Sequence, residues 1–373
     1  MKILIFSWRD IKNPKSGGAE VLTHEMAKRW VKRGHQVSLV SARFPGSKAS
    51  ETTDGIKIFR PAKFFQYSPF SYLLYLIRTA KFYQKNLTGK YDIIVDQVHG
   101  LPFFTPFYVK EKVILFPLEV AKEIWRYEIP FPFWPFGWLL EFAYIKLFRN
   151  RPFLTISPST AKDLKNLGVK NVSIVTPGIS LQPQPSIPRK SQSPLIVSLS
   201  RLTPMKRIEV TIRAFKIISN DFPRAKLLLI GQGRKSYLQK LKAEIKKSKL
   251  TRKVIFTSFV REKKKQELLS QAWVLVSTSL HEGWGLNVIE AATCGTPAVV
   301  YRVPGLVDAV QDRKTGVICK VNTPEELAKE VARILTNASL RKKFSQNALE
   351  YSRQFDWEKS AKEGLAVLKK IVA

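Results

Sequence analysis

The chain has 373 residues, enough for about two domains, and its 45% hydrophobic content is sufficient for large buried cores. These values exclude collagen-like, low-complexity and wholly disordered chains. The 63 Lys and Arg residues outnumber the 29 Asp and Glu residues, and the formal net charge of +34 predicts anionic partners such as nucleic acid, an anionic membrane or phosphorylated small molecules. The alternative is a lysine-rich composition that only keeps the protein soluble.

The first half of the chain alternates short apolar runs with helical patterns. Helices are expected over 19–33 and 159–167, among others. Strands are expected near 2–7, 36–41, 56–59, 92–95, 112–116, 153–156 and 172–175. This alternation predicts a parallel sheet covered by helices on both faces.

A run rich in Pro, Ser and Gln, residues 178–194, separates this half from a second one and predicts a linker. The alternation restarts, and the chain is helical from about residue 324. The strands of the second half are expected at 195–199, 226–230, 254–257, 273–277 and 297–301. We therefore predict an α/β protein with two doubly wound domains, 1–177 and 195–350, facing a central cleft. A C-terminal helix, 351–373, is expected to pack back on the first domain.

Two features predict the cellular compartment. The only cysteines, Cys294 and Cys319, exclude a disulfide framework and a Cys-x-x-Cys zinc pattern, which favours the reduced cytoplasm. The apolar run at the N-terminus is too short for a signal peptide, and no uncharged run approaches the roughly 18 residues of a membrane span.

The most informative motif is the segment 281–290, His-Glu-Gly-Trp-Gly-Leu-Asn-Val-Ile-Glu, which follows an expected strand and opens an expected helix. Its glycines allow backbone N–H groups to approach a ligand, and a helix N-terminus favours a phosphate. Glu282 and Glu290 are eight positions apart, so on a helix they can share one face and accept hydrogen bonds from sugar hydroxyls. The alternative is a capped helix with two solvated glutamates.

A second motif carries Arg201 and Lys206 at the carboxyl end of the expected strand 195–199. A guanidinium and an ammonium five positions apart around a proline turn can both reach one diphosphate. Surface charge is the alternative in so basic a chain. Gly17 and Gly18, after the first strand, are weaker candidates for a backbone anion site, and the Gly231-Gln232-Gly233 segment is similar in kind.

Taken in this order, these motifs resemble those of the retaining glycosyltransferases of family 4, over nearly the whole chain. The most specific match is the pair Glu282 and Glu290, separated by seven residues. The other matches are Gly17-Gly18-Ala19-Glu20, Ser157-Pro158-Ser159, Arg201 with Lys206, and Thr176-Pro177-Gly178-Ile179, which lacks the family's Asn.

The resemblance implies a GT-B fold of two Rossmann-like domains, the first binding the acceptor and the second the nucleotide sugar. It implies retaining, metal-independent transfer of a sugar from a nucleotide sugar to a glycan or lipid-linked acceptor, with no cofactor. The chain agrees on the metal point, because it has no Asp-x-Asp motif and its four histidines are scattered.

The family pattern also implies a role for each matching residue. Glu282 is implied to be catalytic beside the donor sugar, and Glu290 to bind the ribose hydroxyls. The remaining donor-binding residues are Arg201 and Lys206 on the diphosphate and the backbone of Gly283, Trp284, Gly285 and Leu286. Gly17 and Gly18 are implied to form a phosphate or acceptor loop.

One position departs from the family pattern. Leu118 occupies the place where the family commonly has a donor-contacting His. His99, at the end of the preceding strand, is a second catalytic candidate, although a lone histidine is more often structural. This departure leaves an inactive transferase fold as an alternative.

Two aromatic-rich stretches, 64–77 and 129–140, have basic flanks, a pattern that suits a membrane interface. It predicts a cytoplasmic protein in peripheral contact with an anionic membrane surface, although ordinary core and cleft wall are the alternative. The basic segment 235–265 lacks interleaved aromatics and matches no DNA-binding module, so nucleic acid is not expected. The competing functions are a basic polyanion- or membrane-binding protein on an inactive transferase fold, and a sugar phosphorylase or epimerase of the same architecture.

Overall fold

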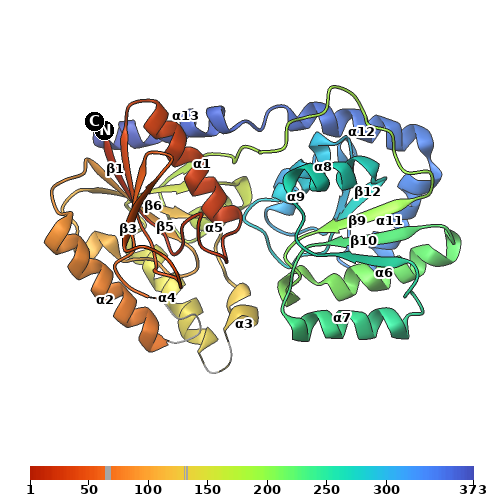
Figure 1. The fold of residues 1–373 in the computed structure, drawn as a ribbon, viewed down its shortest axis with the longest axis horizontal. Coiled ribbons are helices and arrows are strands. Elements are labelled where there is room, and N and C mark those ends of the chain that lie inside the picture. Colours follow the sequence, from red (N-terminus) through yellow and green to blue (C-terminus); the bar gives the residue numbers. More distant parts are fainter. Residues whose placement is uncertain (64–68, 130, 132) are drawn as a thin grey trace. The chain divides into compact units, whose positions relative to one another are not determined.

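The structure is a computed structural model that describes residues 1–63, 69–129, 131 and 133–373. The chain forms two compact units (Figure 1). One comprises Met1–Gly178 with Asp356–Ala373, and the other comprises Ile179–Phe355.

The first unit is built on an eight-stranded sheet in the order β3-β4-β2-β1-β5-β6-β7-β8. All neighbouring strands are parallel except β3 and β4, a hairpin that turns at Asp54 and Gly55, both with positive φ. The strands are β1 (Lys2–Phe6), β2 (Gln36–Val40), β3 (Ser50–Thr53), β4 (Ile56–Phe59), β5 (Ile93–Val98), β6 (Lys112–Pro117), β7 (Pro152–Thr155) and β8 (Asn171–Ile174).

Helices cover both faces of this sheet (Figure 1). Buried residues of β1, β5 and β6 share one core cluster with α2, α4 and α5, which therefore lie on the same face. Helices α1 and α13 pack on each other. Helix α1 also contacts β2, and α13 contacts β6. The helices are α1 (Gly18–Lys32), α2 (Pro69–Asn86), α3 (Ile124–Glu128), α4 (Trp134–Leu147), α5 (Pro158–Asn166) and α13 (Trp357–Val372).

The C-terminal helix α13 is tied to the first unit by close contacts. The Trp30 indole donates to the carbonyl of Ala361 at 2.8 Å, and Arg29 pairs with Glu358 at 2.7 Å. A Cβ on Gly364 would lie 2.4 Å from Met26 Cε, so this glycine allows α13 to approach α1. Asp356 caps the helix by accepting from the N–H groups of Glu358 and Lys359.

The second unit has a six-stranded, fully parallel sheet in the order β11-β10-β9-β12-β13-β14. Its strands are β9 (Leu195–Leu199), β10 (Lys226–Ile230), β11 (Val254–Thr257), β12 (Val274–Ser277), β13 (Ala298–Val300) and β14 (Gly316–Ile318). Its helices are α6 (Ile208–Asp221), α7 (Lys235–Lys247), α8 (Glu262–Gln271), α9 (Leu286–Thr293), α10 (Leu306–Ala309), α11 (Pro324–Thr336) and α12 (Ala338–Ser352).

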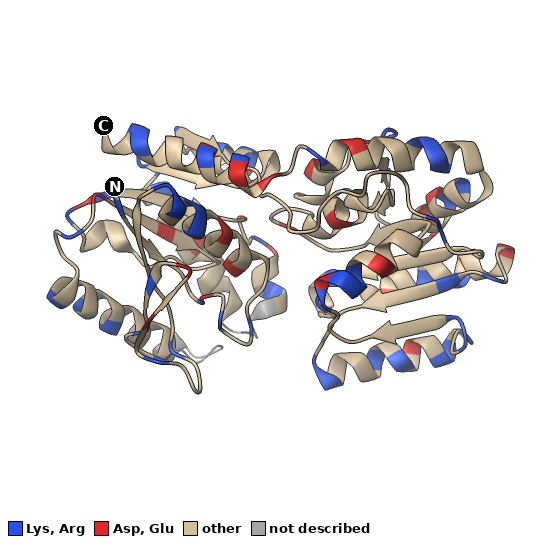
Figure 2. Ribbon diagram, turned by 45° about the horizontal axis from the view of Figure 1, so that its top comes forward, with Lys and Arg blue, Asp and Glu red and all other residues tan. Residues whose placement is uncertain are grey.

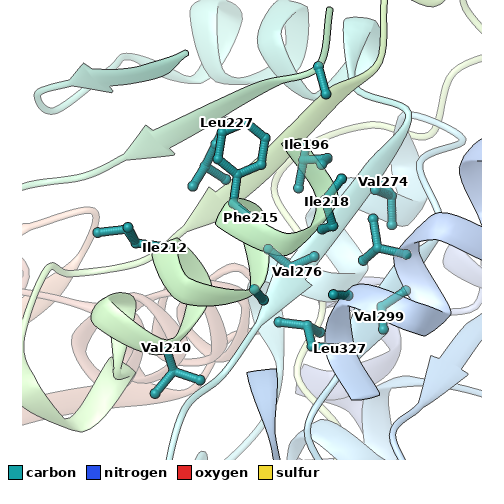
Figure 3. Close-up of a cluster of buried hydrophobic side chains, with 14 of the residues drawn as sticks. Ile196, Val210, Ile212, Phe215, Ile218, Leu227, Val274, Val276, Val299 and Leu327 are labelled. Atoms are coloured by element: carbon teal, nitrogen blue, oxygen red, sulfur yellow. The ribbon is translucent and has the colours of Figure 1, made fainter. Parts of the chain in front are cut away.

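The core of the second unit lies between the sheet and helices α6 and α11 (Figure 3). Ile196 and Val276 project from the central strands β9 and β12 against Phe215 of α6 and Leu327 of α11. Near-continuous apolar runs in these strands are the pattern of parallel strands buried on both faces. The predicted fold class of two doubly wound α/β domains is confirmed.

Residues 179–194, predicted as part of a linker, belong to the second unit. The backbone N–H of Gln184 donates to Thr293 O at 2.9 Å, and that of Ser191 donates to Gln271 O at 3.0 Å. Lys190 Nζ donates to Thr296 Oγ1 at 2.7 Å and to Cys294 O at 3.1 Å. Backbone and side-chain hydrogen bonds therefore hold this Pro-rich segment along α8 and α9.

Candidate active site

Arg201 lies in a loop at the carboxyl end of β9, where ligands bind in open α/β sheets. A glycine segment after β10 packs on this loop, since the N–H of Leu202 donates to Gln232 O at 2.7 Å. A Cβ on Gly231 would lie 1.8 Å from Ser200 O, and one on Gly233 would lie 2.2 Å from Leu202 O. The glycines at 231 and 233 therefore allow the two loops to pack closely. The Arg201 side chain itself is exposed.

Glu282 is the centre of a second group at this end of the sheet. Its Oε1 accepts from Lys206 Nζ at 2.5 Å and from Ser279 Oγ at 2.7 Å. The segment that carries it is held to the Lys206 turn, because the N–H of Leu280 donates to Met205 O at 2.9 Å. The structure thus brings together two predicted site residues, Lys206 and Glu282, that are 76 positions apart.

The glycine-rich segment ends at α9. Gly285 occupies the N-cap position, and a Cβ there would lie 2.9 Å from Ala309 Cβ, so the helix begins close to α10. Glu282 precedes the helix, so the prediction that Glu282 and Glu290 share one helical face is wrong. Gly283 precedes α9 and Leu286 is its first residue, and this N-terminus is the positive end of the helix dipole.

Trp284 is buried and packs on Phe355, with ring centroids 5.8 Å apart. Its indole N–H has no hydrogen-bond acceptor among the described residues. This ring has a structural contact within the second unit, which the sequence pattern did not indicate.

Glu290, in the second turn of α9, forms an ion pair with Lys265 of α8. Both side chains are less than one-fifth exposed, 18% and 17% respectively. Burial raises the pKa of the Glu290 carboxyl, and the adjacent Lys265 ammonium opposes that rise. Lys265 thus favours the ionised form, which accepts hydrogen bonds on both oxygens.

The two glutamates share one pattern. A lysine binds Oε1 in each, Lys206 on Glu282 and Lys265 on Glu290. Neither Oε2 accepts a hydrogen bond from another described residue. Each carboxylate therefore keeps one oxygen for the hydroxyl groups of a ligand while the other is neutralised by a cation.

Gly305 sets the position of the Glu282 backbone, and it gives a testable prediction. Its φ is +76°, and a Cβ there would lie 2.1 Å from Glu282 O. We expect Gly305→Ala to lower the free energy of unfolding by about 3 kcal/mol or more, because left-handed strain and a backbone clash add together. Chemical denaturation measures this loss.

Gly34→Ala is the matched control for Gly305→Ala. Gly34 has φ +80° but nothing within 4 Å of a Cβ. It is expected to cost only the conformational strain of about 1–2 kcal/mol. Equal losses in the two variants would contradict a role for Gly305 in placing Glu282.

The first unit holds the other predicted site residues. Gly17 caps α1, and its N–H donates to Glu20 Oε2 at 2.6 Å. Glu20 is buried and also pairs with Arg9 at 2.9 Å. The Gly17 amide is thus already engaged, while Gly18 is the first residue of α1.

His99 follows β5 and is exposed. Leu118, immediately after β6, is buried and does not offer a polar group to a ligand. The nearest buried acid to His99 in sequence is Asp96, whose pKa burial raises to about 6. Asp96 accepts from the N–H groups of Phe103 and Thr105, which holds the loop after His99.

Sequence reasoning missed three residues of the second unit's site: Lys265, Ser279 and Asn287. Asn287 Nδ2 donates to Leu199 O at 3.0 Å and ties α9 to the end of β9. Asn287 and Ser279 lie in or beside the recognised motif. Lys265 is 25 positions from its partner on another helix, and no spacing rule indicates it. In the described ranges, no group of three or more His, Cys, Asp or Glu side chains is placed to hold a metal ion.

Comparison with known proteins identifies the family. Residues 16–183 match the model described as Glycosyltransferase Family 4, and residues 183–351 match the model described as Glycosyl transferases group 1. The chain is a glycosyltransferase of family 4. The expectation of a transferase with a GT-B fold is confirmed.

Two curated relatives illustrate the range of similarity. MJ1607 of Methanocaldococcus jannaschii, an uncharacterized glycosyltransferase, is 24% identical over 99% of this chain and 98% of its own length. The poly(glycerol-phosphate) alpha-glucosyltransferase of Bacillus subtilis is 29% identical over 43% of this chain. The matched part of this glycosyltransferase spans only 23% of that protein.

A solved structure shows the fold over the whole length. The Anabaena protein Alr3699/HepE, in complex with UDP-glucose, has a TM-score of 0.76 and 16% sequence identity. The match covers 99% of this glycosyltransferase and all of that chain.

Proposed function

We propose that this glycosyltransferase moves a sugar from a nucleoside diphosphate sugar to a hydroxyl group of a glycan or lipid-linked acceptor. The observation that carries the proposal is the arrangement of Glu282 and Glu290, each with one oxygen held by a lysine and the other available. One carboxylate can bind the donor sugar and the other the ribose. The UDP-glucose in HepE supports a donor of this class.

The proposal includes transfer without a metal ion. The leaving diphosphate needs positive charge in the transition state, and Arg201, Lys206 and the N-terminus of α9 supply it at the strand ends. Arg201 is exposed and has no ion-pair partner among the described residues, so it is free to bind phosphate oxygens.

The proposal also includes retention at the anomeric carbon, which the motif pattern of the family implies. Glucose is α-linked in UDP-glucose, so retention gives an α-glucoside. The name of the Bacillus subtilis relative, an alpha-glucosyltransferase, supports that outcome. Glu282 holds hydroxyl groups of the donor sugar in this reaction.

A thermal-shift panel at fixed, moderate salt tests the donor assignment. It contains UDP, GDP, ADP, CMP and pyrophosphate. A ligand at 100 times its dissociation constant stabilises the folded protein by about 2.7 kcal/mol, a shift of roughly 5–10 °C. We expect one nucleoside diphosphate to stand out and Glu290→Ala to remove its shift. Equal shifts with every anion favour simple polyanion binding and contradict the donor site.

A second experiment tests the metal dependence and the stereochemistry of the transfer. The preferred nucleotide's sugar conjugates are incubated with acceptor and EDTA, and NMR coupling constants report the anomeric configuration of the product. We expect turnover with EDTA and a product of the donor's configuration. Inversion, or loss of turnover that a divalent cation restores, contradicts the proposed mechanism.

A further inference from the structure

The outer side of α2 exposes large apolar side chains. Phe70, Leu73 and Ile77 follow helical spacing and are 75%, 55% and 43% exposed. The other side of the same helix buries Tyr75 and Tyr83 in the core. Because the core accounts for only one side of α2, the apolar outer side needs another explanation.

Helix α4 and the segment before it repeat this feature. The buried side of α4 carries Tyr144 and Ile145. The exposed large apolar residues of this region are Tyr127, Phe131, Phe133, Phe136, Trp138, Leu139, Leu140 and Leu147. We call them, together with Phe70, Leu73 and Ile77, the apolar surface.

The two helices lie on the same face of the first sheet, because both contribute to the core cluster over β1, β5 and β6 (Figure 1). In the second unit, by contrast, the exposed large apolar residues are few and scattered over several elements: Ile217, Ile255, Phe259 and Val321. Single exposed residues are normal, whereas a concentration on one face indicates an interaction site.

The exposed charges of α2 and α4 are positive, whereas α3 adds acids, the exposed Glu123 at its start and Glu128 at its end. Helix α2 contains no acidic residue. The acid of α4, Glu141, is buried, and it accepts from the N–H groups of Ala121 and Lys122 and from the Trp125 indole. The exposed cations are Arg78, Lys81, Lys85, Arg126, Lys146, Arg149 and Arg151. Two of them lie over aromatic rings, Arg126 over Trp134 and Lys146 over Phe142.

We propose that the apolar surface docks on an anionic phospholipid bilayer. Apolar side chains enter the boundary between headgroups and acyl chains, and the surrounding cations pair with lipid phosphates. Aromatic rings beside Lys and Arg suit that boundary, since one end of such a group is apolar and the other is polar.

The charge around the apolar surface favours a bilayer over a second copy of this chain. A second copy of this chain would bring the same cations against each other, whereas anionic headgroups complement them. The binding is at the surface of the bilayer, because none of the helices in the described residues is long and apolar enough to cross it. The proposal goes beyond the transfer reaction and does not depend on the donor site.

Vesicle co-sedimentation of the full chain tests this proposal. Vesicles of phosphatidylcholine with phosphatidylglycerol are compared with vesicles of phosphatidylcholine alone. We expect binding to the anionic vesicles only. Replacing Phe136, Leu139 and Leu140 by serine is expected to weaken it at least tenfold. The control replaces Ile255, Phe259 and Val321 by serine and is expected to stay within about twofold of the wild type.

A second pair of variants separates local charge from the total of +34. One changes Arg78, Lys81, Lys146 and Arg149 to glutamine. The other changes Lys240, Lys242, Lys246 and Lys247, exposed lysines of the basic helix α7, to glutamine (Figure 2). Each removes four charges. Only the first is expected to weaken binding, by roughly fivefold for each cation that contacts the membrane.

The fluorescence of Trp138, which is 48% exposed, reports whether the apolar surface inserts into the bilayer. Brominated lipids are expected to quench part of the tryptophan fluorescence, and Trp138→Phe is expected to remove that part. Three results overturn the proposal: no binding to anionic vesicles, an equal loss in the α7 variant, or serine variants that keep vesicle binding but lose self-association. The last would assign the surface to a second copy of the chain.

Discussion

Lys206→Met is expected to lower kcat for sugar transfer by about 10²- to 10³-fold. The ammonium is proposed to neutralise charge that develops on the leaving diphosphate, and loss of one such preorganised group costs about 2.7–4 kcal/mol in the barrier. Methionine keeps the approximate length of the side chain and removes its charge. Initial rates at saturating donor measure the loss.

The control for Lys206→Met is Lys240→Met, which changes an exposed lysine of α7 in the same unit. It is expected to leave kcat unchanged. The structure also pairs Lys206 with Glu282, so a purely structural role must be separated from phosphate binding. Lys206→Met is expected to weaken binding of the nucleoside diphosphate but not of the nucleoside. Unchanged diphosphate affinity would limit Lys206 to positioning Glu282.

Glu290→Gln is expected to weaken binding of the ribonucleoside diphosphate by about 10- to 100-fold. A hydrogen bond to an ionised acceptor contributes about 1.5–3 kcal/mol, against about 0.5–1.5 kcal/mol for a neutral acceptor such as an amide, and the loss is counted for each ribose hydroxyl. The 2′-deoxy analogue is expected to lose much less affinity, because it lacks one of the hydroxyls. Isothermal titration of both nucleotides measures the difference, and equal losses would contradict ribose binding at Glu290.

Lys265→Met provides a pH test of the same site. Burial raises the pKa of Glu290, and without the Lys265 ammonium that pKa is expected to rise further. Nucleotide affinity should then fall as the pH falls through the raised pKa, since protonation removes an acceptor. The stability of the ligand-free protein should change with pH in the opposite sense. It should fall as the pH rises through that pKa, because burial favours the protonated carboxyl. Lys265→Arg is expected to restore the wild-type pH profile.

The position of the site motifs in the fold could be predicted because each motif follows a strand. Arg201 comes after β9, and Glu282 comes after β12, which is hydrogen-bonded beside β9. Parallel neighbours place their carboxyl ends at the same edge of a sheet, so strand-by-strand reading predicted the region. It could not predict that Glu282 stands in a loop, because the start of α9 depends on Gly285 fitting against Ala309.

The sequence by itself determined the two doubly wound units and the spacing of the two glutamates, because apolar strand periodicity and glycine turns are local properties. Only the tertiary structure decided which lysine neutralises which carboxylate, since Lys206 and Lys265 each lie on a different segment of the chain from the glutamate they bind. It also decided which aromatic residues are core. Helices α2 and α4 are apolar on more than one side, and only packing against the sheet determines which side stays exposed.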